Sequence, residues 1–242
     1  MADIDVKKIW VKAIDSKSAN AFVRRHHYSG KVVNNSQLHF GCFYDNRLHG
    51  VLSFGPSMDK SKLIGLVSGT GWNEFVELNR MAFDNFLPRN SESRCIAVCL
   101  RLIRRECPHI KWVISFADGT QCGDGTIYRA SGFVLTGISK NSSILEFPEG
   151  ERVAITTLTA NGNEPAAQKL REKYKIVYDG SASLKSYFNV GAKFLEGFQL
   201  RYIYLIDRSS KLTVPVLPFT AIDDVGAGMY KGESVPVRDR KE

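Results

Sequence analysis

Polar side chains that can move protons follow an apolar run in the middle of the chain. The stretch from Ser115 to Phe133 reads S-F-A-D-G-T-Q-C-G-D-G-T-I-Y-R-A-S-G-F, so Asp118 ends the apolar run and Tyr128 follows a glycine-rich loop. This pattern predicts a strand, a loop and a helix. In open α/β sheets, ligands bind in the crevice beyond the carboxyl ends of the strands. Asp118 is therefore a candidate for acid–base chemistry, with Tyr128 in the first turn of the helix that follows.

A histidine pair followed by a tyrosine supplies a second set of candidates. Helical periodicity over residues 16–27 places His26 in the middle of an apolar face, which predicts a core histidine. His27 and Tyr28 fall at the margin of that face and at the helix exit, so His27 is the better functional candidate. Two other histidines lack metal-like spacing and are interpreted as structural or surface residues, namely His39 and His49.

A basic residue interrupts a strand that is otherwise apolar. The segment from Glu74 to Phe83 (E-F-V-E-L-N-R-M-A-F) predicts a central strand, in which alternation puts Glu77 and Asn79 on one face and Arg80 on the other. A buried charge needs a partner. Two interpretations are open: an internal ion pair or bulge, or an Arg80 guanidinium that reaches into a site and meets an anion.

The start of the next helix has the character of an anion site. The run P-R-N-S-E-S leads into a helix that ends near Cys107, with Asn90 or Ser91 as its cap. Unpaired backbone N–H groups, the positive end of the helix dipole and nearby Arg89 favour an anion there. The expected cofactor-binding residues are Arg80, Ser91, Ser93 and Arg94. The arginines on the far side of this helix are a solvated face or phosphate contacts.

The elements that must position these residues alternate along the chain. The predicted strands span residues 8–14, 38–54 as a hairpin turning at Asp45 and Asn46, 74–83, 111–118, 133–138, 143–147, 153–158 and 198–206. The predicted helices span residues 16–27, 91–107, 126–131 and 166–173, the last opened by residues 161–165. Residues 179–191 show no clear period. The fold class is α/β (α+β), a mixed central sheet with helices on both faces.

Length and composition bound the class of protein. The chain has 242 residues, 43% of them apolar, which favours a globular protein with a substantial core. Its net charge of +8 favours an anionic partner, with nucleic acid as the first candidate. We expect a catalytic domain at 1–210 and an extension at 211–242 that packs on it or trails. No segment approaches the roughly 18 apolar residues of a membrane span, and the charged N-terminus is no secretory signal, so a cytoplasmic location is expected. Five cysteines without C-x-x-C spacing argue against a disulfide framework or a zinc ribbon.

Four motifs occur in order between residues 20 and 140. They read H-H-Y-S-G-K from His26, E-L-N-R from Glu77, P-R-N-S-E-S-R from Pro88, and S-F-A-D…G-D-G-T-I-Y-R-A-S-G-F from Ser115. Together they resemble the Mom family, bacteriophage DNA-modification enzymes that form a divergent branch of the GNAT acyltransferase fold. The usual GNAT signature Gln/Arg-x-x-Gly-x-Gly/Ala is absent, and Cys122-Gly-Asp stands where the family tends to have Gly-His.

The resemblance implies a transferase that adds a carbamoylmethyl (acetamido) group to the exocyclic N6 amine of adenine in double-stranded DNA. The modification would protect phage DNA from host restriction in the host cytoplasm. The resemblance also implies a cleft for acetyl-CoA or a related acyl donor, and bound iron. The catalytic residues carried over by position are His27, Tyr28, Asp118 and Tyr128, and the implied iron ligands are His27, Asp118 and Tyr128.

Within this reading the tyrosines would stack on a base extruded from the duplex, and Asp118 would act as the base or orient the amine. Arg80 and Ser93 would hold the anion. A homodimer is left open, and no membrane partner is expected. Two other functions also stay open: an acyltransferase of the same fold acting on a small amine or protein, and a non-catalytic DNA-binding module. Weak, salt-insensitive DNA binding would favour the acyltransferase.

Overall fold

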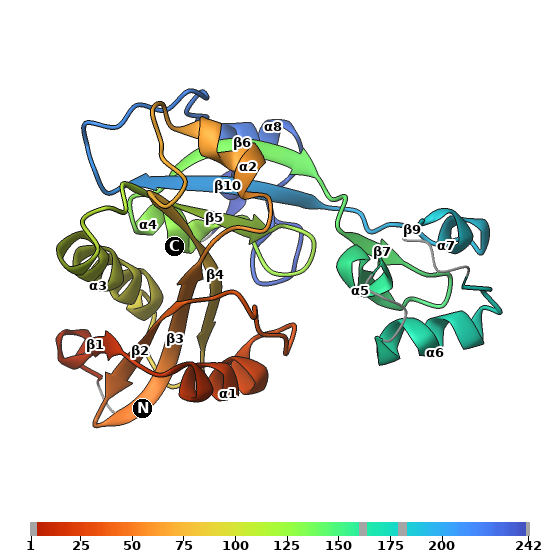
Figure 1. The fold of residues 1–242 in the computed structure, drawn as a ribbon, viewed down its shortest axis with the longest axis horizontal. Helices are drawn as coiled ribbons and strands as arrows, with labels where there is room; N and C mark the ends of the chain where they lie inside the picture. Colours follow the sequence, from red (N-terminus) through yellow and green to blue (C-terminus); the bar gives the residue numbers. More distant parts are fainter. Residues whose placement is uncertain (1–3, 160–163, 179–182, 241–242) are drawn as a thin grey trace. The chain divides into compact units, whose positions relative to one another are not determined.

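The computed structural model describes residues 4–159, 164–178 and 183–240, and these form two compact units that interleave along the chain (Figure 1). The first unit comprises Met1–Ala117, Gly125–Gly137 and Leu200–Ala221, and the second comprises Asp118–Asp124, Ile138–Gln199 and Ile222–Glu242. The expected domain boundary at residue 210 stays a prediction. Among the described residues, no helix combines the length and the apolar character that crossing a bilayer requires.

The predicted mixed sheet is confirmed. Seven strands run in the order β1-β2-β3-β4-β5-β10-β6, with antiparallel pairing from β1 to β4 and parallel pairing of β4 with β5. Their bounds are β1 Trp10–Ala13, β2 Leu38–Tyr44, β3 Arg47–Gly55, β4 Phe75–Phe83, β5 Trp112–Asp118, β6 Val134–Lys140 and β10 Phe198–Leu205. The helical segments are η1 Val6–Lys8, α1 Ser16–His26, α2 Lys60–Leu63, η2 Ile64–Leu66, α3 Ser91–Glu106, α4 Thr126–Ala130, α5 Ile155–Thr159, α6 Pro165–Lys173, α7 Lys185–Asn189, α8 Thr220–Asp224 and η3 Val237–Asp239.

Helices cover both faces of the sheet in the first unit. Val23 of α1 packs in one buried cluster with Val51 of β3. Val51 pairs across the sheet with Gly41, and the next residue of β2, Cys42, points to the opposite face because side chains alternate along a strand. Cys42 contacts Cys95 of α3. α1 and α3 therefore lie on opposite faces, as predicted.

A tight turn sets the register of the hairpin formed by β2 and β3. Asp45 and Asn46 have φ values of 48° and 58°, the left-handed pair that a two-residue type I′ turn requires. The turn expected at these two residues is confirmed. Register matters here because a slip by one residue would move every buried side chain of the hairpin to the other face.

A β-bulge changes the faces of β4. Ser53 pairs with Arg80 and the next residue, Phe54, pairs with Leu78, so Asn79 is an extra residue in β4. The insertion reverses the alternation beyond it. Glu77 and Arg80 therefore project from the same face, and the prediction that they lie on opposite faces is wrong. The bulge that the sequence left open as an explanation is confirmed.

The second unit contains a small sheet that the sequence did not predict. β7 (Ile144–Glu146) lies between β8 (Arg152–Ala154) and β9 (Lys193–Phe194) in an antiparallel sheet. Its core includes Leu145, Leu158 and Leu170, so α5 and α6 share that core. The extended segment predicted at 153–158 is wrong beyond Ala154, because α5 follows at once. The helix predicted at 166–173 is confirmed, while residues 161–163 and 179–182 lie outside the described residues.

The two hairpin histidines are buried and structural. His39 Nδ1 lies 2.8 Å from Ser53 Oγ, and His49 Nδ1 lies 2.9 Å from Asp84 Oδ2. Burial lowers the pKa of His39 below its ordinary value of 6.5. The folded chain thus holds this imidazole neutral, whereas the unfolded chain protonates it more readily.

We predict that His39 makes the fold less stable in acid. Its contribution is fully present above about pH 6.5 and is lost as the pH falls from there towards its lowered pKa, because protonation favours the unfolded chain. In His39→Gln, the drop in the urea midpoint between about pH 7.5 and about pH 5.5 should be smaller than in the native chain. His109→Gln, at an exposed histidine, is the control. An equal drop in native and His39→Gln chains would contradict this assignment.

Candidate functional site

Arg80 is half-buried on β4, and its guanidinium ties two segments together. Its Nε donates a hydrogen bond to the carbonyl oxygen of Lys31 at 3.0 Å, and its Nη1 donates to the carbonyl oxygen of Asn79 at 2.8 Å. Because Lys31 ends the H-H-Y-S-G-K motif, this contact attaches the loop after α1 to the central strand. Two of the motifs recognised in the sequence are thereby brought together within the first unit.

Three ionisable side chains lie close enough to Arg80 to act on its charge. Burial lowers the pKa of Arg80 below its ordinary value, while the charges of Tyr28, Glu77 and Tyr128 oppose that shift. Tyr28 comes from the loop after α1 and Tyr128 from α4, so a third motif joins the same neighbourhood. We call Tyr28, Glu77, Arg80 and Tyr128 the Arg80 cluster.

Glu77 is the member of the Arg80 cluster that sequence reasoning missed as a functional candidate. Burial raises the pKa of its carboxyl, and hydrogen bonding to Ser57 and the charge of Arg80 only partly offset the effect. A carboxyl with a raised pKa holds a proton more readily than an ordinary glutamate does, which is a common property of catalytic acids and bases. The available signal was an acidic residue three positions before an arginine in an apolar strand, but strict alternation placed the two on opposite faces.

Aromatic packing and one glycine position Tyr128. Its ring centroid lies 5.5 Å from that of Tyr202 and 5.6 Å from that of Phe133. Gly125, just before α4, has φ 89°, and a Cβ atom there would overlap the ring of the fully buried Tyr202. Only glycine satisfies both conditions, which explains the second glycine of the G-D-G run.

His27 is the C-cap residue of α1, which confirms its predicted position at the end of the helix. Its Nδ1 lies 2.8 Å from Ser29 Oγ and accepts a hydrogen bond from the Ser29 amide at 3.2 Å. Its ring lies 4.4 Å from that of Tyr28, which is 57% exposed. His26 is only half-buried and stacks on Phe22, so the prediction of a core histidine is wrong. The fully buried residues of α1 are Ala19 and Val23, so the buried stripe of this helix does not extend to His26.

Asp118 ends β5 and belongs to the second unit, where the chain turns back over it. Its Oδ1 accepts hydrogen bonds from the Thr120 amide at 3.0 Å and from the Thr120 hydroxyl. Its carbonyl oxygen accepts from the amides of Gln121, Cys122 and Gly123. The two contacts with Thr120 hold the Asp118 carboxylate in one orientation.

Two of the residues implied as iron ligands are engaged by neighbouring residues, and their role as ligands stays a prediction. The Nδ1 atom of His27 is engaged by the hydroxyl and the amide of Ser29. One oxygen of Asp118 is already engaged by Thr120. Within the described ranges, no group of three or more His, Cys, Asp or Glu side chains is arranged to bind a metal. No step of the reaction below depends on iron.

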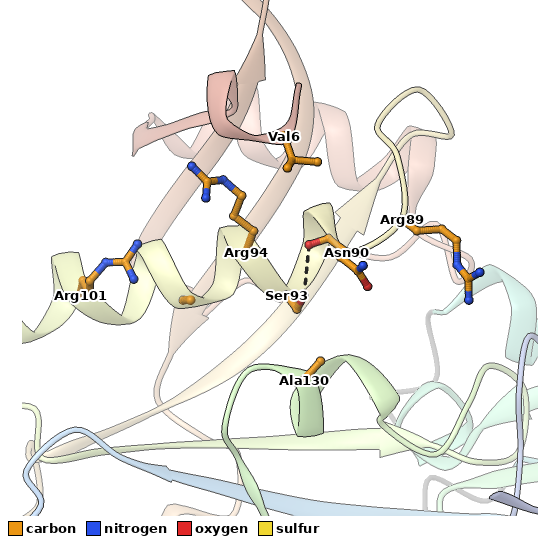
Figure 2. Close-up of a pocket in the computed structure, with 8 residues that line it drawn as sticks. Val6, Arg89, Asn90, Ser93, Arg94, Arg101 and Ala130 are labelled. Carbon is orange, nitrogen blue, oxygen red and sulfur yellow. Dashed lines mark hydrogen bonds between the residues drawn. The ribbon is translucent and has the colours of Figure 1, made fainter. Parts of the chain in front are cut away.

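A basic pocket lies at the start of α3 (Figure 2). The cavity has a volume of about 420 Å³, and its lining includes the polar residues Arg89, Asn90, Ser93, Arg94 and Arg101. Arg94 donates from Nη2 to the Lys7 carbonyl oxygen at 3.4 Å, and its buried Nε has no hydrogen-bond partner among the described residues. Positive charge, an unpaired donor and a helix N-terminus together favour an anionic ligand.

Asn90 occupies the N-cap position of α3, as predicted, but its side chain makes no capping hydrogen bond and its φ is 70°. Ser91 is fully buried and donates its hydroxyl to the Pro88 carbonyl oxygen at 2.7 Å. Ser93 donates its hydroxyl to the Asn90 carbonyl oxygen at 3.1 Å (Figure 2). The serines brace the turn instead of occupying the helix amides. Ser93 and Arg94 line the pocket, whereas Arg80 belongs to the Arg80 cluster and Ser91 supports the turn.

The central strands separate near the Arg80 cluster. The parallel ladder of β4 and β5 has three pairs in the described chain, ending with Glu77 opposite Ile114. Beyond it, Ser115 Oγ donates to the Leu78 carbonyl oxygen at 3.5 Å. A ladder that stops inside two strands leaves backbone groups that a ligand can pair with.

The chain matches the model of a known protein family over most of its length. The family model of the Mom protein family matches residues 8–221. The methylcarbamoylase Mom of Escherichia phage Mu is 39% identical over 155 residues, which cover 64% of this chain and 63% of that protein, less than two thirds of its length.

Two acetyltransferases of known structure align with this chain at TM-scores below 0.5. The ribosomal-protein-S18-alanine N-acetyltransferase from Escherichia coli gives a TM-score of 0.44 at 8% identity, covering 82% of this chain and 94% of that chain. A GNAT family acetyltransferase from Elizabethkingia anophelis with acetyl-CoA bound gives 0.43 at 12%, covering 82% and 98%. The family model covers most of the sequence, from the first strand to the start of α8, and the chain belongs to the Mom protein family.

Proposed function

We propose that this protein transfers a carbamoylmethyl group to the exocyclic N6 amine of adenine in double-stranded DNA. The observation that carries the proposal is the match to the Mom family over residues 8–221, whose phage Mu relative is a methylcarbamoylase. The Arg80 cluster supports it, because three of the four motifs contribute side chains to one neighbourhood. Masking adenine in this way would protect DNA from restriction in a host cytoplasm.

The substrate amine sets the chemical demands on the site. The lone pair of an adenine amine is delocalised into the ring, so the amine is a weak nucleophile and must be oriented beside a base. Inside a duplex it is also out of reach. Extruding the base costs a few kcal/mol, which stacking on aromatic side chains offsets. Tyr28, which is 57% exposed, and Tyr128 are the aromatic residues proposed to receive it.

Two carboxyl groups have environments suited to different tasks. Asp118, held as an acceptor by Thr120, is proposed to accept an N–H hydrogen bond and orient the amine. Glu77, whose pKa burial raises, is proposed to take the proton that N6 loses. The new N6–carbon bond replaces the bond between the carbamoylmethyl carbon and its carrier, and the bonding pair leaves with the carrier. Arg80 is proposed to stabilise negative charge that develops during transfer.

The pocket at the start of α3 is proposed to hold the phosphates of acetyl-CoA or a related acyl donor, whose acetyl unit must gain an amide nitrogen and a leaving group on its methyl carbon before the transfer described above. Its arginines and the unpaired Nε of Arg94 supply donors for an anion. DNA as the partner is supported by charge: in sequence, the second unit holds slightly more acidic than basic residues, so the +8 excess lies on the first unit. Bound iron and a homodimer stay predictions.

Nucleosides from the DNA of cells that express the protein test the proposed function. We predict a deoxyadenosine heavier by one carbamoylmethyl group, and a fall of roughly 100-fold or more in its yield with Asp118→Asn, because the amide cannot hold the amine in the same way. Asp224→Asn, at an exposed carboxylate of the same unit, should match the native yield. If DNA from cells that express the native protein lacks the heavier nucleoside, the proposed function is wrong. If Asp118→Asn gives the full yield, the role proposed for Asp118 is wrong.

Glu77 should control how the reaction rate depends on pH. A raised pKa means that the carboxylate forms, and the rate climbs, at a higher pH than the ordinary glutamate value of 4.5 allows. In Glu77→Gln this acid limb should vanish and the rate should fall by roughly 100-fold. Glu74→Gln, on the same stretch of chain but paired with Lys111, is the matched control. A Glu77→Gln profile with the native limb and rate would exclude Glu77 as the proton acceptor.

Calorimetric titration with coenzyme A tests the pocket at the start of α3. Arg94→Gln should weaken binding by roughly tenfold, the typical loss for a charge-assisted hydrogen bond. Arg104→Gln, on the same helix outside the pocket, should bind as the native chain does. Equal affinities of the native and Arg94→Gln chains would place the donor elsewhere.

A further inference from the structure

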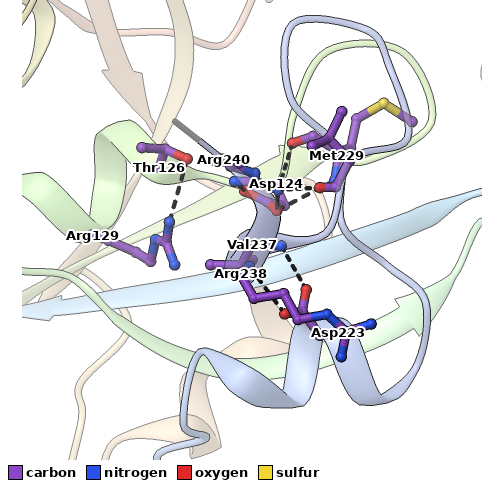
Figure 3. Close-up of polar contacts among 9 residues, drawn as sticks. Asp124, Thr126, Arg129, Asp223, Met229, Val237, Arg238 and Arg240 are labelled. Carbon is purple, nitrogen blue, oxygen red and sulfur yellow. Dashed lines mark hydrogen bonds and ion pairs between the residues drawn. The ribbon is translucent and has the colours of Figure 1, made fainter. Parts of the chain in front are cut away.

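The C-terminal segment folds back onto the loop that follows Asp118 (Figure 3). We call residues 222–240 the strap; both it and residues 118–124, the Asp118 loop, belong to the second unit. The Asp124 amide donates to the Met229 carbonyl oxygen at 3.0 Å, and the Gly232 amide donates to the Cys122 carbonyl oxygen at 2.9 Å. The strap lies beyond the stretch that matches the family model, so the family resemblance carries no expectation for it.

A buried ion pair joins the strap to the far end of the loop. Arg240 Nη1 donates to Asp124 Oδ1 at 2.9 Å, and its Nη2 donates to Asp124 Oδ2, which makes a two-pronged contact (Figure 3). Nη2 also donates to the carbonyl oxygens of Val235 at 2.9 Å and Met229 at 3.3 Å. The side chain of Asp124 is 0% exposed and that of Arg240 is 9% exposed.

The strap is itself folded, so it presents Arg240 in a defined position. The Asp223 carboxylate accepts hydrogen bonds from the Val237 amide at 2.6 Å and the Arg238 amide at 3.3 Å (Figure 3). The Val235 amide donates to the Gly228 carbonyl oxygen at 3.1 Å. These contacts close the chain into turns that end at Arg240.

The Asp118 loop connects two residues of the proposed reaction. It begins at Asp118, whose carbonyl oxygen holds three loop amides, and it ends at Asp124, directly before Gly125 and the helix that carries Tyr128. The near end is thus closed by local hydrogen bonds. The far end depends on the Asp124 carboxylate, which is buried and paired with a residue more than a hundred positions away.

We propose that Arg240 is a positioning residue, which fixes the Asp118 loop through Asp124 and thereby orients Asp118. A buried ion pair is seldom more stabilising than an apolar pair of the same size, so stability alone is a poor reason for it. A planar guanidinium that grips both carboxylate oxygens does fix the direction of the loop. The catalytic consequence rests on the function proposed above.

The test compares full-length variants by amide hydrogen exchange and by the rate of adenine modification. Arg240→Met removes the clamp, Arg240→Lys keeps a charge without the two-pronged geometry, and Arg238→Met is the matched control at a side chain that is 76% exposed. Because Arg240→Met leaves Asp124 buried without its cation, the double variant Asp124→Asn, Arg240→Met is included to keep the fold.

We expect the amides of Gln121, Cys122 and Gly123 to exchange roughly tenfold faster or more in Arg240→Met and in the double variant, while amides of β2 and β3 do not change. Arg240→Lys should fall between these and the native chain, and Arg238→Met should match the native chain. At saturating DNA, the rate should fall by roughly tenfold in Arg240→Met, with the KM for DNA unchanged.

Exchange in the folded double variant within roughly threefold of the native chain would overturn the proposal. If the native chain modifies no DNA, the proposed function is wrong. The exchange rates of these three amides would still show whether the strap fixes the loop.

Discussion

Buried charge has to be given partners, and in this protein the partners come from segments far away in the sequence. Arg80 projects from a central strand and is satisfied by two backbone carbonyl oxygens, one of them on the loop after α1. That requirement draws the H-H-Y-S-G-K motif to the strand that carries Glu77. The same demand recurs in the second unit, where Asp124 is buried and Arg240 returns from the C-terminal strap to meet it.

The β-bulge makes the first of these arrangements chemically useful. Without Asn79 as an extra residue, Glu77 and Arg80 would lie on opposite faces of β4. With it, a carboxyl whose pKa is raised by burial shares a face with a guanidinium, and both lie where the ladder between β4 and β5 ends. An acid–base group, a positive charge and two tyrosines are then available in one neighbourhood, which is what transfer to a weak amine nucleophile requires.

Local patterns predicted what local physics controls. The Asp45-Asn46 turn, the extent of α3 and the glycine-bounded α4 follow from periodicity and turn chemistry, and the structure has them. The bulge at Asn79 depends on pairing with β3, so alternation along β4 alone gave the wrong faces. The second sheet and the Arg240–Asp124 pair are contacts between distant segments, and no local pattern reports them. Among the predicted site residues, the position of His27 at the end of α1 was predicted correctly, because it depends on contacts within the helix. The buried hydroxyl of Ser91, which donates to the Pro88 carbonyl oxygen, was not predicted.

The central claim is that this site joins a carbamoylmethyl carbon to the exocyclic nitrogen of adenine in DNA. The most direct test adds the purified protein and a cell lysate, as the source of the donor, to a duplex whose adenine amines carry nitrogen-15, followed by tandem mass spectrometry of the nucleosides. The account predicts a heavier deoxyadenosine in which the added group is bonded to the labelled nitrogen. An unmodified duplex in a lysate whose proteins or small amines have gained the group would contradict it.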